Sequence, residues 1–245
     1  MVSCVLGLRG RTAAGHLVTA GFGGRTYFIS FANGGTTPDF TITGGRAFGV
    51  GSSTIYGLDT AQTCVLIPPP FPPWKYCMPT WSASVNGAQK PSNAGTNRVA
   101  FASTAGTVTV FDATNGSIKF TTANTGTSLN PTAFFNGHVL TTGAYGMLRA
   151  YNVATCVNGC APEWTANLGA ATTQAPAVGL VGGTYRVFAT TSGGTILGYT
   201  TNGCGASSCN PTHTGAAPHG RAATSRPIIR NGVVLATFGN DLVSF

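Results

Sequence analysis

The residues best suited to chemistry in this 245-residue chain are four basic side chains. The run THTGAAPHGR holds His213, His219 and Arg221, and His138 opens an apolar run further upstream. Two imidazoles near one cation can bind a metal or move a proton at neutral pH. These four residues are therefore the candidates for a hydrolytic site of the esterase or lactonase type.

Carboxylates are scarce, which limits both acid–base and metal chemistry. The acids of the chain are Asp39, Asp59, Asp112, Glu163 and Asp241. No nucleophile elbow, P-loop or His-Glu-x-x-His motif occurs, and a calcium site needs several converging oxygen ligands. Asp59 and Asp112 end apolar runs, where a short side chain accepts backbone N–H bonds at a turn. We therefore expect no metal and no cofactor.

Six of the seven cysteines form three close pairs, which are Cys64 with Cys77, Cys156 with Cys160, and Cys204 with Cys209. Each second cysteine opens a similar run, CMPTW, CAPEW or CNPTH. The gaps of 12, 3 and 4 residues do not match the regular thiolate spacing of zinc sites. We predict three disulfides that close their loops locally, with Cys4 left over, and disulfides favour an oxidising compartment.

The elements that must position these residues recur every 40 to 53 residues, which indicates a repeat architecture. Each unit has a proline, a Gly-containing turn, two apolar strands joined by a tight turn, and a third strand opened by a large ring. The prolines are Pro38, Pro91, Pro131, Pro176 and Pro227. Because proline has no N–H, it suits an edge strand, and we assign it to the outer edge. The rings, expected to pack between neighbouring sheets, are Trp81, Phe120, Trp164 and His213.

Four short strands per unit predict an all-β chain folded as a single β-propeller over residues 1–245. The composition agrees, with 35 glycines, 42% hydrophobic residues and only 7% charged residues. We expect six blades, with five or seven as alternatives. Residues 1–45, which contain HLVTAG and RTYFISF, form an irregular first blade, and 46–245 hold the regular repeats. The chain stops after a second strand, NDLVSF, so we expect the N-terminal run SCVLGL to complete the last blade and close the ring.

The run DATNGSIKF resembles the PQQ-like (quinoprotein-type) β-propeller repeat over about residues 38–245. Asp112, Gly116 and Phe120 stand where that repeat has Asp, Gly and Trp. The cysteine-bracketed units that end at Trp81 and Trp164 look like secreted bacterial members. Quinoprotein dehydrogenases of the family carry adjacent cysteines and an acidic calcium site, and this chain has no adjacent cysteines and one glutamate. The resemblance therefore implies a non-catalytic secreted scaffold, with a PQQ-dependent oxidoreductase least favoured.

The charge and hydropathy of the chain limit the partners and the cellular location that we expect for it. The net charge is +8, but the bases are scattered and form no stripe, so we expect no nucleic-acid partner. No apolar run of about 18 residues is present, so no membrane span is expected. The start of the chain, MVSCVLGLRGR, is a poor signal peptide. The cysteine pattern nevertheless favours an extracytoplasmic location (secreted, periplasmic or cell surface), which implies that the natural start lies upstream.

The strongest binding candidate is the run IPPPFPPWKY at 67–76, between Cys64 and Cys77. Its prolines stiffen a polyproline-like arm that carries Phe71, Trp74 and Tyr76. The arm either contacts a protein or glycan partner or covers its own blade. We therefore expect a non-catalytic binding or assembly scaffold, with a hydrolase at the central channel as the alternative.

Overall fold

The computed structural model describes residues 79–245 and seven earlier strand segments, at 16–20, 26–30, 40–43, 46–51, 54–59, 65–66 and 75–76. Within these residues the strands form five four-stranded sheets and one three-stranded sheet. One 3-10 turn, η1 (Pro218–Gly220), interrupts the β structure. The chain is therefore all-β, as predicted.

Four sheets repeat one antiparallel order along the chain. The first contains β3 (Phe40–Thr43), β4 (Arg46–Gly51), β5 (Thr54–Asp59) and β8 (Trp81–Ser84). The second contains β9 (Ser92–Asn93), β10 (Arg98–Ala102), β11 (Val108–Asp112) and β12 (Ile118–Thr121). The third contains β13 (Ala133–Phe135), β14 (His138–Gly143), β15 (Met147–Asn152) and β16 (Trp164–Asn167). The fourth contains β17 (Ala177–Val181), β18 (Thr184–Thr190), β19 (Thr195–Thr200) and β20 (His213–Ala216).

Two further sheets lie at the ends of this series. The three-stranded sheet contains β21 (Ile228–Arg230), β22 (Val233–Phe238) and β23 (Asp241–Ser244). The other contains β1 (His16–Ala20), β2 (Thr26–Ser30), β7 (Lys75–Tyr76) and β6 (Val65–Leu66). In that sheet β2 pairs with β7 in parallel, so residues 65–76 supply two strands that the sequence did not indicate. Residues 3–8 lie outside the described part of the chain, so blade number and ring closure stay predictions.

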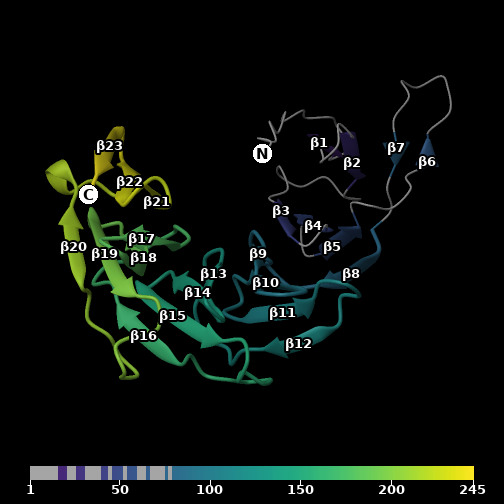
Figure 1. Ribbon diagram of the computed structural model, residues 1–245, viewed down its shortest axis with the longest axis horizontal. Helices are drawn as coiled ribbons and strands as arrows, with labels where there is room; N and C mark the ends of the chain where they lie inside the picture. The colour runs from purple at the N-terminus through teal and green to yellow at the C-terminus, as the bar shows by residue number, and fades with distance from the viewer. Residues whose placement is uncertain are drawn as a thin grey trace.

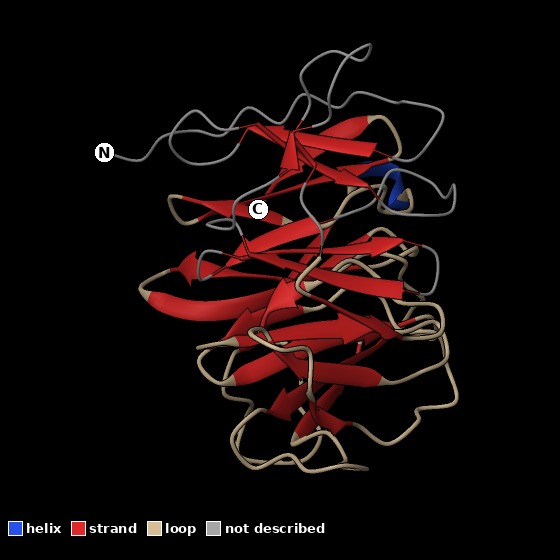
Figure 2. Cartoon of the chain, turned by 90° about the vertical axis from the view of Figure 1, so that its right-hand side faces the viewer, coloured by secondary structure: helices blue, strands red, loops and turns tan. Residues whose placement is uncertain are grey.

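The sheets are arranged radially around a common centre (Figure 1). The strands β3, β9, β13, β17 and β21 lie innermost, and β9 contacts β3 and β13 while β17 contacts β13 and β21. The strands β8, β12, β16 and β20 lie at the outer rim (Figure 1). Turned by 90°, the molecule shows its turns gathered at two opposite faces, with the strands running between them (Figure 2).

The assignment of the prolines to the outer edge was wrong. Pro91 directly precedes β9, Pro176 precedes β17 and Pro227 precedes β21, all of which are inner strands. Every sheet has two edge strands, and the inner edge also leaves N–H groups without a ladder partner. Proline is therefore tolerated at the inner edge as well as at the outer edge, because neither position requires an N–H donor for the ladder.

The core consists of apolar layers between neighbouring sheets. In β10, Val99 and Phe101 pack toward the preceding sheet, in one cluster with Phe48 and Trp81. The alternate residues of the same strand, such as Ala100, pack toward the following sheet. Successive strand side chains point to opposite faces, so one apolar strand stabilises two interfaces.

The outer-strand rings close these layers, as predicted for Trp81, Phe120 and Trp164, all of which are buried. The indole of Trp81 donates from Nε1 to the carbonyl of Ala113 in the next sheet, at 3.1 Å. A Cβ at Gly116 would lie 2.5 Å from the same indole. Trp164 lies equally close to Gly203, where a Cβ would be 2.7 Å away. Because these two glycines have no side chain, they leave the space that the indole rings of Trp81 and Trp164 occupy.

His213 occupies the corresponding position at the start of β20 but is not buried. Its ring makes an edge contact with Phe188, at 6.4 Å between centroids, and its Nδ1 lies 3.2 Å from Thr212 Oγ1. The aromatic packing predicted for it is thus limited to the contact with Phe188.

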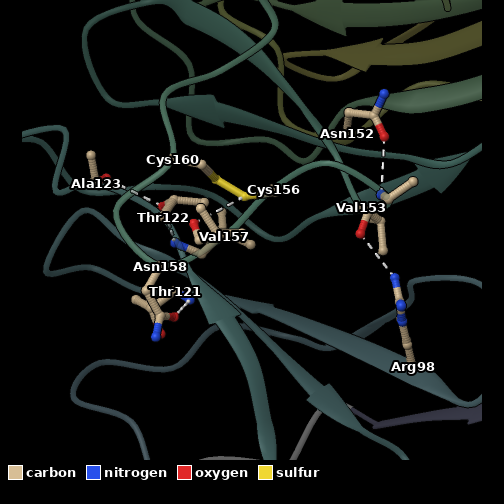
Figure 3. The surroundings of a disulfide bond; sticks show 12 residues. Arg98, Thr121, Thr122, Ala123, Asn152, Val153, Cys156, Val157, Asn158 and Cys160 are labelled. Atoms are coloured by element: carbon tan, nitrogen blue, oxygen red, sulfur yellow. Dashed lines mark hydrogen bonds between the residues drawn. A yellow bond between two sulfur atoms is a disulfide. The ribbon is translucent and has the colours of Figure 1, made fainter.

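Two of the predicted disulfides are present in the described residues, Cys156–Cys160 and Cys204–Cys209. Cys64, Cys77 and Cys4 lie outside them. Both disulfide-closed loops also form hydrogen bonds with a neighbouring sheet. The first loop adds to the outer strand of the preceding sheet, where Ala123 N donates to the Cys160 carbonyl at 3.0 Å and Thr121 N donates to Asn158 Oδ1 at 2.9 Å (Figure 3). The second loop does the same, with Thr165 N donating to the Ser207 carbonyl at 2.8 Å.

Candidate binding site at the inner strands

A cavity of about 780 Å³ lies between the inner strands, and we call it the inner cavity. Its walls come from β9, β13, β17 and β21, with Thr41 of β3. Pockets for small ligands or partner side chains typically have volumes of about 300–1,000 Å³. The inner cavity is therefore large enough to admit a ligand or a segment of a partner.

The lining combines neutral polar, apolar and cationic side chains. Ser92, Thr132 and Gln174 supply hydroxyl and amide groups, and the lining also includes apolar residues such as Phe134 and Ile229. Lys90 and Arg226 are its two charged members. No histidine, cysteine, aspartate or glutamate is among the described lining residues. Among its described residues the cavity therefore carries positive charge and offers no imidazole, thiol or carboxylate to act as a general base.

Hydrogen bonds between sheets fix these walls. The hydroxyls of Ser92 and Thr132 lie 2.6 Å apart across two sheets. Thr142 donates to the Gln174 carbonyl at 2.7 Å, and Thr190 donates to the Ser225 carbonyl, next to Arg226, at 3.3 Å. Satisfied buried hydrogen bonds rigidify a site, so the cavity is formed before any ligand enters.

His138 lies away from the inner cavity. It opens β14, is only 7% exposed and is not a lining residue. Its Nδ1 lies 3.1 Å from the Asn136 carbonyl and its Nε2 lies 3.3 Å from Glu163 Oε2. The structure therefore places His138 at the turn between β13 and β14.

The other candidates for hydrolysis are also separate from the cavity and from His138. His213 is the first residue of β20 and His219 lies in η1 after that strand. Arg221 pairs with Asp241 at 3.3 Å. The structure therefore does not gather these residues into one site. Within the described residues, no group of three His, Cys, Asp or Glu side chains is placed to hold a metal.

The turn role predicted for Asp112 is confirmed. Asp112 Oδ1 accepts from Thr114 N at 2.8 Å, and Asn152 accepts from Ala154 N in the same way at 3.0 Å. The Lys119 ammonium, 2.9 Å from Asp112 Oδ2, lowers the pKa of this carboxyl below its usual range, and the Thr114 N–H bond adds to the effect. Asp112 therefore ionises readily and serves the turn and an ion pair.

Two buried tyrosines titrate differently from free phenols. Burial raises the pKa of Tyr199 to about 12, and burial is also the main reason why the pKa of Tyr151 is raised. Both rings lie in the layers between sheets. They act as core residues that remain neutral at physiological pH.

The proline-rich arm cannot be placed relative to the cavity. Phe71 and Trp74 lie outside the described residues, and Tyr76 is described only as part of β7. At the base of the arm, Val65 pairs with Tyr76 and Leu66 with Lys75. The binding role of Phe71, Trp74 and Tyr76 therefore stays a prediction.

Sequence reasoning missed Lys90 and Arg226, although a signal for them was present. Each stands immediately before a repeated proline, in the dipeptides Lys90–Pro91 and Arg226–Pro227. Once the prolines are known to open inner strands, the preceding residue falls at the mouth of the cavity. Positive charge at these positions could then have been predicted.

Radially packed four-stranded sheets around a central cavity define a β-propeller, and solved structures support this class. BamB from Moraxella catarrhalis is similar over 98% of this chain and 77% of its own, with a TM-score of 0.56 and 13% identity. The computationally designed Ika8 protein matches over 99% and 71%, with a TM-score of 0.63 and 10% identity. The WD40 β-propeller domain of Doa1 matches over 94% and 71%, with a TM-score of 0.64 and 12% identity. At such identities the likeness concerns the fold alone.

No family model matches the chain, and no curated protein matches it by sequence. Within the described residues, no helix has the length and apolarity needed to cross a bilayer.

Proposed function

We propose that the chain is a non-catalytic, extracytoplasmic β-propeller that acts as a binding or assembly module, with the inner cavity as its binding site. The observation that carries this proposal is the composition of the cavity. It is large and held by hydrogen bonds between sheets, yet its described lining offers no histidine, cysteine or carboxylate. Such a site can recognise a ligand, and its described lining offers no imidazole or carboxylate to activate a hydroxyl nucleophile.

The charge of the cavity indicates the partner group. Arg226 contributes a cation to the described lining of the cavity, and the whole chain carries a net charge of +8. Cations in a cleft with low-dielectric walls attract anions from solution. We therefore infer that an acidic segment of a protein partner enters the inner cavity.

The proline-rich arm at 67–76 supplies a second contact in this proposal, to the same protein or to a glycan on it. Stiff proline-rich segments lose little conformational entropy on binding. The two disulfides in the described residues support an oxidising, extracytoplasmic compartment, as does the PQQ-like resemblance of the repeat.

A titration with a hexaglutamate peptide tests the binding site. Calorimetry of the full chain should show binding that weakens as salt is raised, because salt screens exposed charges. Arg226→Gln should weaken binding by about tenfold or more, which corresponds to the loss of one charged hydrogen bond. Arg230→Gln is the matched control, since Arg230 lies in the same inner strand β21 but does not line the cavity, and it should bind as the wild type does.

Equal losses in both variants would show that only net charge matters and would overturn the cavity as the site. The hydrolase alternative is tested in parallel with ester, lactone and glycoside substrates. Turnover that is abolished by His138→Gln, His213→Gln or His219→Gln would refute the non-catalytic proposal.

A further inference from the structure

A second hollow lies between the β13–β16 sheet and the β17–β20 sheet, away from the inner cavity. It has a volume of about 520 Å³, and we call it the turn cleft because two hairpin turns and the segment after β19 form it. Its lining residues are Phe135, Asn136, Gly183, Thr184, Tyr185, Thr200, Thr201 and Asn202. None of these is charged.

An aromatic pair forms one wall of the turn cleft. The rings of Phe135 and Tyr185 lie 4.4 Å apart between centroids and are inclined by 31°. Tyr185 is nevertheless 48% exposed. The pair is thus a rigid apolar surface open to solvent.

Two amides lie beside this surface. Asn136 Nδ2 donates to Asn202 Oδ1 at 3.2 Å, across the junction of the two sheets. This bond leaves Asn136 Oδ1 and Asn202 Nδ2 without a hydrogen-bond partner among the described residues, and both side chains are exposed. One acceptor and one donor are therefore held in place next to an aromatic surface.

The backbone turn at Asn136 and Gly137 holds the Asn136 amide in a fixed position. Asn136 has a φ of 45° and Gly137 a φ of 79°, the geometry of a two-residue hairpin turn between β13 and β14. His138, which the hydrolase hypothesis singled out, lies with Nδ1 3.1 Å from the Asn136 carbonyl and holds this turn. His138 is a positioning residue for the cleft.

We propose that the turn cleft binds a neutral saccharide. A sugar ring has apolar C–H faces and a rim of hydroxyls that both donate and accept hydrogen bonds. An aromatic surface takes the C–H face, and amides offer the matching donors and acceptors. The absence of any charged residue from the described lining disfavours anionic and cationic ligands, because a charge would lose hydration without a compensating partner.

A proline-rich peptide is the competing occupant, because aromatic grooves also bind polyproline helices. The structure favours the saccharide because the free donor and the free acceptor lie together on one rim, where the hydroxyls of a sugar can use both. A polyproline segment offers mainly carbonyl acceptors and would leave Asn136 Oδ1 unpaired.

Saturation-transfer NMR of the full chain with lactose, cellobiose and diacetylchitobiose tests the proposal. At least one disaccharide should bind with a Kd below about 10 mM, which is weak by the usual scale of affinities. Tyr185→Ala removes the exposed ring, and Asn136→Gly removes the amide while keeping a backbone that favours positive φ. Each should weaken binding by about tenfold, equivalent to one stacked ring or one hydrogen bond.

Two matched variants serve as controls. Tyr145→Ala removes a more exposed ring from the turn between β14 and β15, where Tyr145 is 77% exposed. Asn231→Gly makes the same exchange at φ 51° in the hairpin between β21 and β22. Both should bind as the wild type does. The proposal is overturned if no disaccharide binds, if the controls lose binding as well, or if only a synthetic IPPPFPPWK peptide binds.

Discussion

At the residue scale, the contact between tryptophan and glycine is the feature that joins one sheet to the next. Gly116 has a φ of 73°, and a Cβ there would lie 2.5 Å from the ring of Trp81. The side chain that a larger residue adds would therefore meet a buried indole that donates a hydrogen bond to the same turn. We expect this position to tolerate no residue but glycine.

Gly116→Ala should lower the free energy of unfolding by about 2–4 kcal/mol, from overpacking added to backbone strain. Gly126→Ala separates the two causes, because Gly126 has a similar φ of 71° and a Cβ added there would meet nothing within 4 Å. It should cost only about 1 kcal/mol, from the backbone alone. Denaturant unfolding measures both, and equal losses would mean that the tryptophan contact contributes nothing.

Individual residues could be predicted from sequence where their role is local. The turn-capping bonds of Asp112 and Asn152 depend on residues two positions away, so the local pattern sufficed. The role of His138 could not be predicted in this way. Its partner Glu163 is 25 residues distant, and only the pairing of β14 with its neighbours brings the two together.

At the element scale, the disulfide loops connect neighbouring sheets. The Cys156–Cys160 loop bonds to β12 of the preceding sheet, and the Cys204–Cys209 loop bonds to β16. The strand β7 lies in the loop between β5 and β8, and its parallel pairing with β2 repeats this arrangement at the sheet that contains β1 and β2. A loop that adds to an outer edge strand also covers N–H groups that would otherwise be open to pairing with another chain.

Replacing Cys156 and Cys160 by serine should release this loop from β12. Hydrogen exchange of the Thr121 and Ala123 amides should accelerate about tenfold or more, because both donate to the loop and local opening becomes easier. The Thr165 amide is the internal control, since it bonds to the other disulfide loop and should keep its rate. Unchanged exchange at Thr121 and Ala123 would show that the disulfide has no influence beyond its own loop.

Sequence reasoning found the strands of the regular repeats but not their order from the centre outwards. A proline such as Pro91 marks an edge strand, and both edges of a radial sheet meet that condition equally. The correct choice depends on which edge faces a neighbouring inner strand, as β9 faces β3 and β13. That contact joins separate repeats, and no local pattern encodes it.

At the scale of the whole molecule, the repeat period and composition were enough to predict a β-propeller. The inner cavity was harder to predict, because its lining comes from five strands and their flanking residues, spread from Thr41 to Ile229. Its character depends on two cations, Lys90 and Arg226, that are 136 positions apart in the chain. Only the radial fold brings them to one site.

The location of the bound ligand is the most direct test of the proposed function. A hexaglutamate peptide carrying a nitroxide label should broaden the NMR signals of backbone amides on the inner strands, such as Ser92 and Ile228, which line the cavity. Amides of the outer strands, such as that of Lys119 in β12, should be much less affected, and the broadening should disappear in Arg226→Gln. Broadening confined to amides of the outer strands, or no broadening at any amide, would contradict the proposal that the inner cavity is the binding site.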